Sequence, residues 1–259
     1  MKCKTCIVIF AFNRPEYLYV TLDSVFRSPD INKVDVLVYI DGGSDKLPEI
    51  MEVISNFDVR RIYINKHNLM ILWGHVAALR DVFYKLDYER CIYLEDDNLM
   101  RSDCLSFCRN HDPQEFIMSL SGKGNKSMHY RPRGNMITKC NFYDLDNWIS
   151  SLTWIGLARP NRPDQILGFN TTSHDAVFYA FIQDTGNYSE FAGEYYTAHF
   201  GLVGVHSHDI NSEINDLHSK MFAGDRKHWL ENIADIIHKG EYDTKFDSVL
   251  WLKKEFEYK

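Results

Sequence analysis

The sequence of 259 residues has no long hydrophobic run. The apolar stretch nearest its start, Ile7 to Phe12, is far shorter than the ~20 residues that a membrane-spanning helix needs, and is also too short for a signal peptide. We therefore expect a protein that is neither secreted nor anchored to a membrane, with a cytoplasmic location.

Cysteine is sparse as well. Six cysteines occur, and Cys3 and Cys6 form a single CxxC pair without the second pair that a structural zinc site of this type requires. We expect reduced thiols, and the alternative is a redox or metal role for this one pair.

The chain also lacks an excess of basic residues. Its 36 acids outnumber 29 Lys and Arg, and the resulting net charge of -7 argues against nucleic-acid binding driven by total charge. With 45% hydrophobic and 14% aromatic residues it is able to bury a full core. This length suits one elaborated α/β domain, so we expect a single domain over residues 1–259.

Short β-branched runs alternate with amphipathic stretches over the first hundred residues. The predicted strands are Thr5–Phe12, Val34–Ile40, Arg61–Ile64 and Arg90–Leu94. Between the first two, Leu18, Leu22 and Val25 recur at helical spacing after Pro15, a residue that the first turn of a helix tolerates. The alternation is typical of βαβ units and predicts an α/β fold with a parallel sheet.

Polar residues follow three of these strands directly. They are Asn13 and Arg14 after the first, Asp41 and Gly42 after the second, and Glu95, Asp96 and Asp97 after the fourth. Ligands of parallel sheets bind at the carboxyl ends of the strands, so these groups are expected to converge on one crevice. Asp41 there could accept hydrogen bonds from a nucleoside, although a tight glycine turn is the alternative.

The acidic triplet Glu95, Asp96 and Asp97 suggests a cation site. Three carboxylates at the end of a buried strand repel one another and lose hydration, which is costly without a cation. Mg²⁺ and Mn²⁺ prefer oxygen ligands and usually take one or two carboxylates together with diphosphate oxygens and water. The alternative is a solvated turn before a helix, where acids favour the helix dipole.

Three segments together resemble the nucleotide-sugar domain of the GT-A glycosyltransferases. They are IVIFAFNRPEYLYVTLDSV, VYIDGG and GHVAALRDVFYKLDYERCIYLEDD, and the likeness is greatest to the N-acetylglucosaminyltransferase I family, which transfers GlcNAc in β1,2 linkage. The resemblance covers Thr5 to Ser121 and continues to about Asp184. It implies a Rossmann-like GT-A fold with a mixed, mostly parallel sheet flanked by helices. We expect a nucleotide-sugar half at 1–121, an acceptor-binding and catalytic half at 122–218, and a helical segment at 219–259.

The resemblance also implies a role for each polar residue at the strand ends. Asn13 and Arg14 would border the uridine, Asp41 with Gly42 would hold the nucleoside, Glu95 and Asp96 would face the ribose and sugar, and Asp97 would bind Mn²⁺ or Mg²⁺. His75 is the nearest match to a family histidine that contacts the nucleotide. A packed or surface histidine is the alternative for His75.

The second half supplies the remaining candidates. The resemblance places a catalytic base at Asp175, with His174 able to tune or replace it, and the alternative is a helix N-cap formed by Ser173 or Asp175. His206 and His208 follow an apolar run with a period of two, which would put both rings on one face of a strand, toward the metal or diphosphate. A purely structural role is the alternative for both.

A basic segment stands out in this acidic protein. No acid occurs from Phe116 to Tyr143, yet that stretch contains Lys123, Lys126, Arg131 and Arg133 among aromatic residues. Such a mixture suits a polyanion whose bases can stack, and the alternative is a loop that covers the donor diphosphate.

We therefore expect a metal-dependent, inverting glycosyltransferase that uses a UDP-sugar. Its acceptor would be a hydroxymethylated base in viral DNA or, alternatively, a glycan. Two other classes stay open: a nucleotidyltransferase, although no Gly-rich phosphate loop follows the first strand, and a non-catalytic module that binds carbohydrate or nucleotide.

Overall fold

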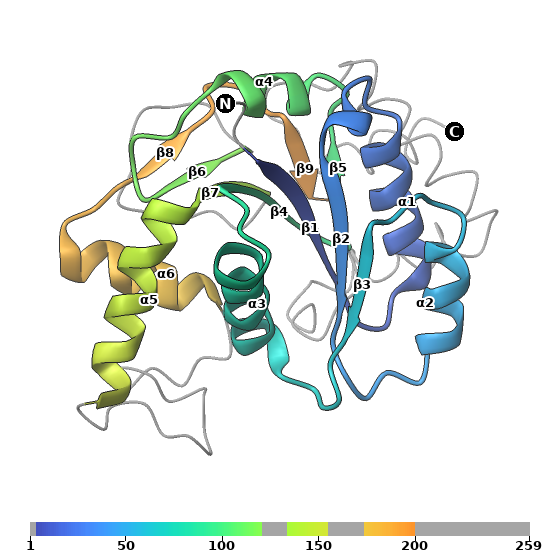
Figure 1. Cartoon of the computed structure of the whole chain (residues 1–259), viewed down its shortest axis with the longest axis horizontal. Coiled ribbons are helices and arrows are strands. Elements are labelled where there is room, and N and C mark those ends of the chain that lie inside the picture. The colour runs from blue at the N-terminus through green and yellow to red at the C-terminus, as the bar shows by residue number, and fades with distance from the viewer. Residues whose placement is uncertain (1–3, 121–133, 155–173, 200–259) are drawn as a thin grey trace, which may run out of the picture.

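The computed structural model describes residues 4–120, 134–154 and 174–199 (Figure 1). The strands are β1 Thr5–Ala11, β2 Asp35–Ile40, β3 Arg61–Ile64, β4 Arg90–Glu95, β5 Asn98–Met100, β6 Ile117–Ser119, β7 Asn135–Thr138, β8 Ser189–Phe191 and β9 Thr197–His199. The α-helices are α1 Pro15–Phe26, α2 Leu47–Ile54, α3 Met70–Arg80, α4 Cys104–Asn110, α5 Lys139–Trp154 and α6 His174–Thr185. A 3₁₀ turn at Ile31–Lys33 precedes β2, and a π-helical turn at Asp81–Lys85 continues α3.

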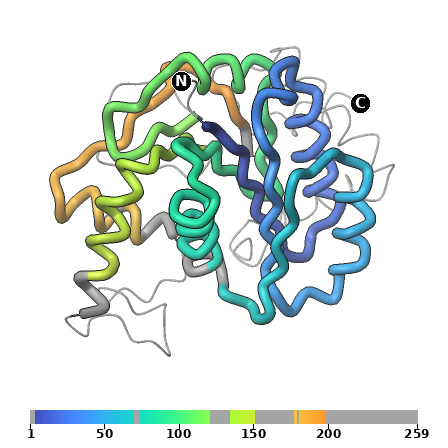
Figure 2. Tube along the Cα trace, in the orientation of Figure 1, coloured from blue at the N-terminus to red at the C-terminus, as the bar shows by residue number. Residues whose placement is uncertain are grey.

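Within these residues the main sheet has the strand order β3-β2-β1-β4-β7-β6-β8. The first four neighbours are parallel, β7 runs antiparallel to both β4 and β6, and β8 is parallel to β6. Figure 2 follows the chain after α6 as it returns to β6 and adds β8 at the far edge. The prediction of a mixed, mostly parallel α/β sheet is confirmed.

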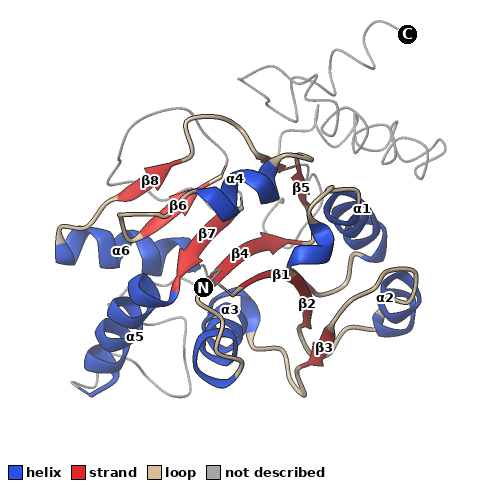
Figure 3. Cartoon of the chain, turned by 45° about the horizontal axis from the view of Figure 1, so that its top comes forward, coloured by secondary structure: helices blue, strands red, loops and turns tan. Residues whose placement is uncertain are grey.

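Helices cover both faces of the sheet, as Figure 3 shows. Alternate residues of β1 point to opposite faces: Cys6 and Val8 pack in one core cluster with residues of α3, α5 and α6, and Ile7 and Ile9 pack in another with residues of α1, α2 and α4. Both faces of β1 are therefore buried from solvent, which explains why its sequence is a continuous apolar run rather than an alternation of apolar and polar residues.

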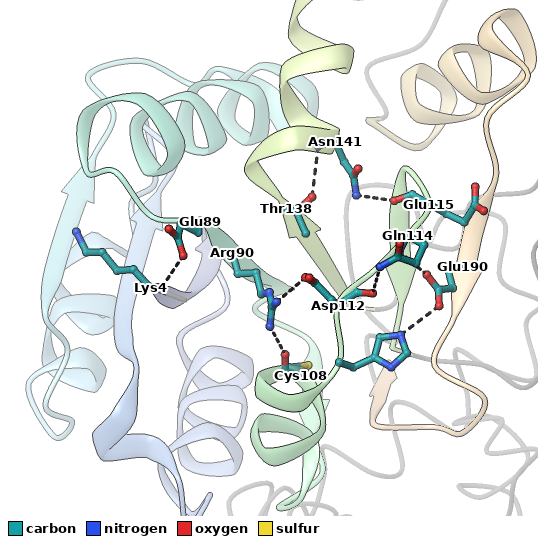
Figure 4. Close-up of polar contacts among 11 residues, drawn as sticks. Lys4, Glu89, Arg90, Cys108, Asp112, Gln114, Glu115, Thr138, Asn141 and Glu190 are labelled. Atoms are coloured by element: carbon teal, nitrogen blue, oxygen red, sulfur yellow. Dashed lines mark hydrogen bonds and ion pairs between the residues drawn. The ribbon is translucent and has the colours of Figure 1, made fainter. Parts of the chain in front are cut away.

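A polar network ties the amino ends of the strands together, away from the edge where ligands of parallel sheets bind (Figure 4). Buried Arg90, the first residue of β4, donates to the Cys108 carbonyl at 3.0 Å and pairs with Asp112. Nearby, Glu190 of β8 accepts from the Gln114 amide at 3.0 Å. These bonds hold α4 and the following loop onto the sheet, which is a structural role.

Among the described helices, none combines the length and the apolar character that a membrane crossing would require. The cysteines that the structure describes are all free, and four of them are buried.

Candidate active site

The carboxyl ends of β2, β1 and β4 lie side by side at one edge of the sheet. Ile40 pairs with Ala11 and Glu95 with Phe10 in the strand register, and the Asp41 amide donates to the Ala11 carbonyl at 2.9 Å. The residues that follow these strands are therefore brought together, as expected from the sequence.

Asp96 and Asp97 are buried, each with 3% of its surface exposed. The Thr21 hydroxyl of α1 donates to the Asp96 carbonyl at 2.7 Å, and the Met100 amide donates to the Ser24 hydroxyl at 3.1 Å. The turn is thus bound to α1 and leads into strand β5 rather than into a helix. The alternative of a solvated turn before a helix was wrong.

The cation beside the two aspartates is a side chain of the protein itself. Arg14 pairs with Asp96 and also with Asp97, the latter at 2.8 Å between Nη1 and Oδ2. Its guanidinium also lies over the ring of Tyr17, 5.2 Å from the centroid. The sequence argument assumed that a divalent metal is needed to neutralise the acids. That argument overlooked Arg14, which supplies one positive charge to the two buried carboxylates.

The pKa values of Asp96 and Arg14 reflect this arrangement. Burial raises the pKa of Asp96 to about 6, against the opposing attraction of Arg14, and the neighbouring charge of Asp97 adds to the rise. Burial acts to lower the pKa of Arg14, but the attraction of Asp96 and Asp97 outweighs it and raises that pKa. Arg14 is therefore a permanent cation.

The raised pKa of Asp96 predicts how stability depends on pH. The folded protein holds this proton more tightly than the unfolded chain, in which an aspartate has a pKa of about 3.9. The stability that this proton contributes is fully present below about pH 4 and is lost as the pH rises through about 6. Urea denaturation at pH 4.5, 6 and 7.5 measures the free energy of unfolding of the wild type and of Asp96→Asn. As the pH rises, the wild type should lose stability relative to Asp96→Asn. A difference that stays constant with pH would contradict the assignment.

Asp41 has two distinct carboxylate oxygens. Its Oδ1 accepts from the Gly42 amide at 3.0 Å, the Leu69 amide at 2.8 Å and Asn65 Nδ2 at 3.3 Å. Its Oδ2 has no hydrogen-bond partner among the described residues. Oδ1 thus fixes the loop between β3 and α3 to the end of β2, whereas Oδ2 takes no part in that contact.

The protein backbone requires a glycine at position 42, a reason that the sequence argument, which placed Gly42 beside the nucleoside, did not include. A Cβ atom there would lie 2.5 Å from the His67 carbonyl carbon and 2.6 Å from the Asn65 carbonyl oxygen. A side chain at this position would push away the same loop that Asp41 holds.

We expect Gly42→Ala to lower the free energy of unfolding by about 1–3 kcal/mol, the usual cost of overpacking. It should also weaken nucleotide binding, because the loop that fixes Asp41 must move. The control is Gly74→Ala, since a Cβ at Gly74 of α3 would meet no other part of the described protein within 4 Å and needs no unusual backbone conformation. Urea denaturation and UDP titration test both variants, and equal behaviour of the two would contradict the steric argument.

The structure places His75 in the core, with 4% of its surface exposed. Its ring packs on Phe10, with the centroids 3.9 Å apart, and it shares a hydrogen bond with the Tyr93 hydroxyl. These are the contacts of a packed histidine, the alternative stated for it above.

His174 and Asp175 are the first two residues of α6, which packs against α3 and α5. Asp175 is therefore the second residue of the helix rather than a residue before it. The structure does not describe the side chains of His174 and Asp175. Seven other candidate residues lie wholly outside the described residues: Ser173, His206, His208, Lys123, Lys126, Arg131 and Arg133.

Sequence reasoning overlooked Asn98 and His199. Asn98 is fully buried, and its Nδ2 donates to Asp97 Oδ1 at 3.0 Å, whereas its Oδ1 has no hydrogen-bond partner among the described residues. His199 pairs with Asn98 across the β5–β9 ladder. No local signal reveals this pairing, because the two strands are short and about a hundred residues apart.

The donor set at this edge fits a hard divalent ion. Asp97 and the orphaned Asn98 Oδ1 both offer oxygen, which Mg²⁺ and Mn²⁺ prefer. The described residues contain no group of three His, Cys, Asp or Glu placed to hold a metal. The described residues would therefore supply only part of the coordination, and Mg²⁺ usually takes further ligands from diphosphate and water.

The fold and this edge of the sheet define a GT-A glycosyltransferase domain. The chain belongs to glycosyl transferase family 2: residues 6–149, more than half of its length, match the model of that family. The predicted class of enzyme is thereby confirmed, whereas the particular likeness to N-acetylglucosaminyltransferase I stays a prediction. No curated protein sequence matches the chain.

Several solved glycosyltransferase structures are similar to this chain. A fragment of TarS from S. aureus in complex with UDP-GlcNAc is 12% identical, with a TM-score of 0.49, and the match covers 88% of this chain and 70% of the fragment. The galactosyltransferase LgtC with donor and acceptor sugar analogs is 13% identical, with a TM-score of 0.44 and coverages of 71% and 72%. The mannosyltransferase PcManGT from Pyrobaculum calidifontis with GDP-Man and Mn²⁺ is 13% identical, with a TM-score of 0.45, and the match covers 57% of this chain and 47% of that one. This chain thus spans less than half the length of the mannosyltransferase.

Proposed function

We propose that the protein transfers a sugar from a UDP-sugar to a hydroxyl group of an acceptor, with inversion at the anomeric carbon. The observation that carries this proposal is the juxtaposition of Asp41 with the buried pair Asp96 and Asp97 at adjacent strand ends in a family 2 domain. At this edge of the sheet, Asp41 suits a nucleoside, and Asp96 and Asp97 suit a diphosphate with its cation.

Asp41 is the residue that would hold the nucleoside. Its Oδ1 is fixed by three donors, so Oδ2 is oriented before the ligand arrives and is ready to accept a hydrogen bond from the uracil ring or a ribose hydroxyl. Preorganisation of this kind reduces the entropy that binding costs. Asn13 and Arg14, which follow β1, would border the same nucleotide.

The diphosphate would lie beside the acidic turn, with Glu95 and Asp96 toward the ribose and sugar. Asp97 would hold Mn²⁺ or Mg²⁺ with Asn98 next to it, and His206 or His208 are further candidate ligands. When bound, such an ion supplies positive charge for the leaving diphosphate. Asp175, tuned or replaced by His174, would take the proton of the attacking hydroxyl.

The acceptor we propose is a hydroxymethylated base in DNA, with a glycan as the alternative. The proposal rests on the basic segment that includes Lys123, Lys126, Arg131 and Arg133, in a chain that is otherwise acidic. Lys and Arg among aromatic residues suit a phosphate backbone and its bases.

The test has a donor stage and an acceptor stage. A panel of UDP-sugars with Mn²⁺, assayed by thermal shift and by slow hydrolysis, should identify one preferred donor, and EDTA should abolish its hydrolysis until Mn²⁺ or Mg²⁺ is added back. That donor is then offered to hydroxymethylated DNA and to oligosaccharides. Release of pyrophosphate from a nucleoside triphosphate, with no UDP-sugar bound or hydrolysed, would contradict glycosyl transfer. Modification of oligosaccharides alone would contradict the DNA acceptor.

A further inference from the structure

Arg14 is held at a fixed point beside the acidic turn. It precedes Pro15, the first residue of α1, and its carbonyl accepts the Leu18 amide at 3.0 Å. The backbone of Arg14 is thus part of the helix start, and its side chain reaches across to the end of β4.

Arg14 is the solvent-facing member of the cluster. Its side chain is 22% exposed, whereas the side chains of Asp96 and Asp97 are each 5% exposed. Any ligand that approaches the two carboxylates from solvent therefore meets the guanidinium first. Both oxygens of Asp97 are already engaged, Oδ2 by Arg14 and Oδ1 by the amide of Asn98.

A guanidinium and a divalent metal compete for the same carboxylate. The two cations repel each other, and the repulsion is strong at a buried site. A guanidinium also binds phosphate as readily as carboxylate, in the same two-pronged geometry. A diphosphate at this edge therefore offers Arg14 an equivalent partner and frees Asp97.

We propose that Arg14 is a resident counter-ion that couples metal binding to nucleotide binding. Without ligands it occupies Asp96 and Asp97. When the diphosphate of the donor arrives, Arg14 moves to it and Asp97 becomes available to the metal, with the orphaned Asn98 Oδ1 beside it. This inference rests on the proposed function in one respect, namely that a nucleoside diphosphate binds at this edge.

The test is a titration of the full chain with Mn²⁺, in which free Mn²⁺ is measured by electron paramagnetic resonance with and without UDP. For the wild type we expect UDP to raise the Mn²⁺ affinity at least tenfold, and by linkage Mn²⁺ should raise the UDP affinity by the same factor. Arg14→Gln should bind Mn²⁺ without UDP at least tenfold more tightly than the wild type does, and should lose most of the coupling. Arg14→Lys, which keeps the charge without the two-pronged geometry, should fall between them.

Arg27→Gln is the matched control, because Arg27, the residue after α1, is 41% exposed and pairs with Asp23 at 2.8 Å, away from the acidic turn. It should leave the Mn²⁺ titration unchanged. Should Arg14→Gln prove too unstable to titrate, the rise in melting temperature on adding Mn²⁺ without UDP replaces the titration, and Arg14→Lys should show a larger rise than the wild type.

Equal Mn²⁺ affinity of the wild type with and without UDP, together with no change in Arg14→Gln, would overturn the inference. The proposed function fails separately. One result would support the inference and contradict the proposed function: UDP raises the Mn²⁺ affinity through Arg14, but the protein hydrolyses no UDP-sugar. Sugar transfer by a protein whose Mn²⁺ affinity does not change with UDP would support the proposed function and contradict the inference.

Discussion

Asp97→Asn is expected to lower the rate of sugar transfer by about 100-fold to 1000-fold, the loss typical when one electrostatic contact to a transition state is removed. Asparagine keeps the shape of the side chain and an oxygen that can face Arg14, so the fold should survive. The loss comes from the missing negative charge, which weakens the hold on the divalent ion at the leaving diphosphate. Steady-state assays with the preferred UDP-sugar over a range of Mn²⁺ concentrations measure the effect.

Asp103→Asn provides the control for Asp97→Asn. Asp103 lies six residues further along the chain and pairs with Arg101 on the surface, where an ion pair contributes little. It should transfer sugar at the wild-type rate. Full activity of Asp97→Asn, with a circular dichroism spectrum like that of the wild type, would remove the metal role from this residue.

Asp175→Asn is expected to reduce kcat by about 100-fold to 10,000-fold, the range that general bases contribute. The Kd for UDP should change little, because the base acts on the acceptor hydroxyl and not on the nucleotide. Stopped assays of transfer, combined with calorimetric titration of UDP, separate the two effects.

The control here is Asp184→Asn, which changes an exposed aspartate near the other end of α6 and should leave kcat unchanged. A parallel loss of UDP affinity in Asp175→Asn would assign Asp175 to the donor site. Full activity of Asp175→Asn together with an inactive His174→Gln would make His174 the base.

β1, β2 and β4 could be predicted from sequence because most of their residues are buried, whereas β3 is mostly exposed and was found from its Ile and Tyr content. β3 begins and ends as predicted, and β1, β2 and β4 differ from their predicted bounds by one residue at one end. In β1, β2 and β4 an unbroken apolar run occupies most positions, so the end of that run lies within one residue of the end of the strand. The same signal located the carboxyl ends of β1, β2 and β4, and with them the residues of the candidate site.

The partners of those residues could not be predicted. The sequence shows three acids in a row, but it does not show that Arg14, about eighty residues earlier, lies against two of them. That contact depends on β1 and β4 being direct neighbours in the sheet, which is a property of the topology and not of either segment. The metal was therefore predicted from a charge balance that omitted the nearest cation.

Gly42 and His75 also depend on contacts with distant segments that the sequence does not reveal. DGG predicts a turn at the end of β2, yet the atoms that require Gly42 belong to the backbone of the loop after β3. His75 has helical spacing with its apolar neighbours, and the sequence alone could not distinguish a ligand contact from its place between Phe10 and Tyr93. In both cases the deciding atoms lie on another segment of the chain.

The most direct test is a crystal structure of the full chain grown with UDP and Mn²⁺. The account predicts uridine at Asp41, the diphosphate in contact with Arg14, and the manganese ion on Asp97, all at the shared edge of β2, β1 and β4. A nucleotide bound anywhere else on the protein, with Arg14 still paired to both aspartates, would contradict it.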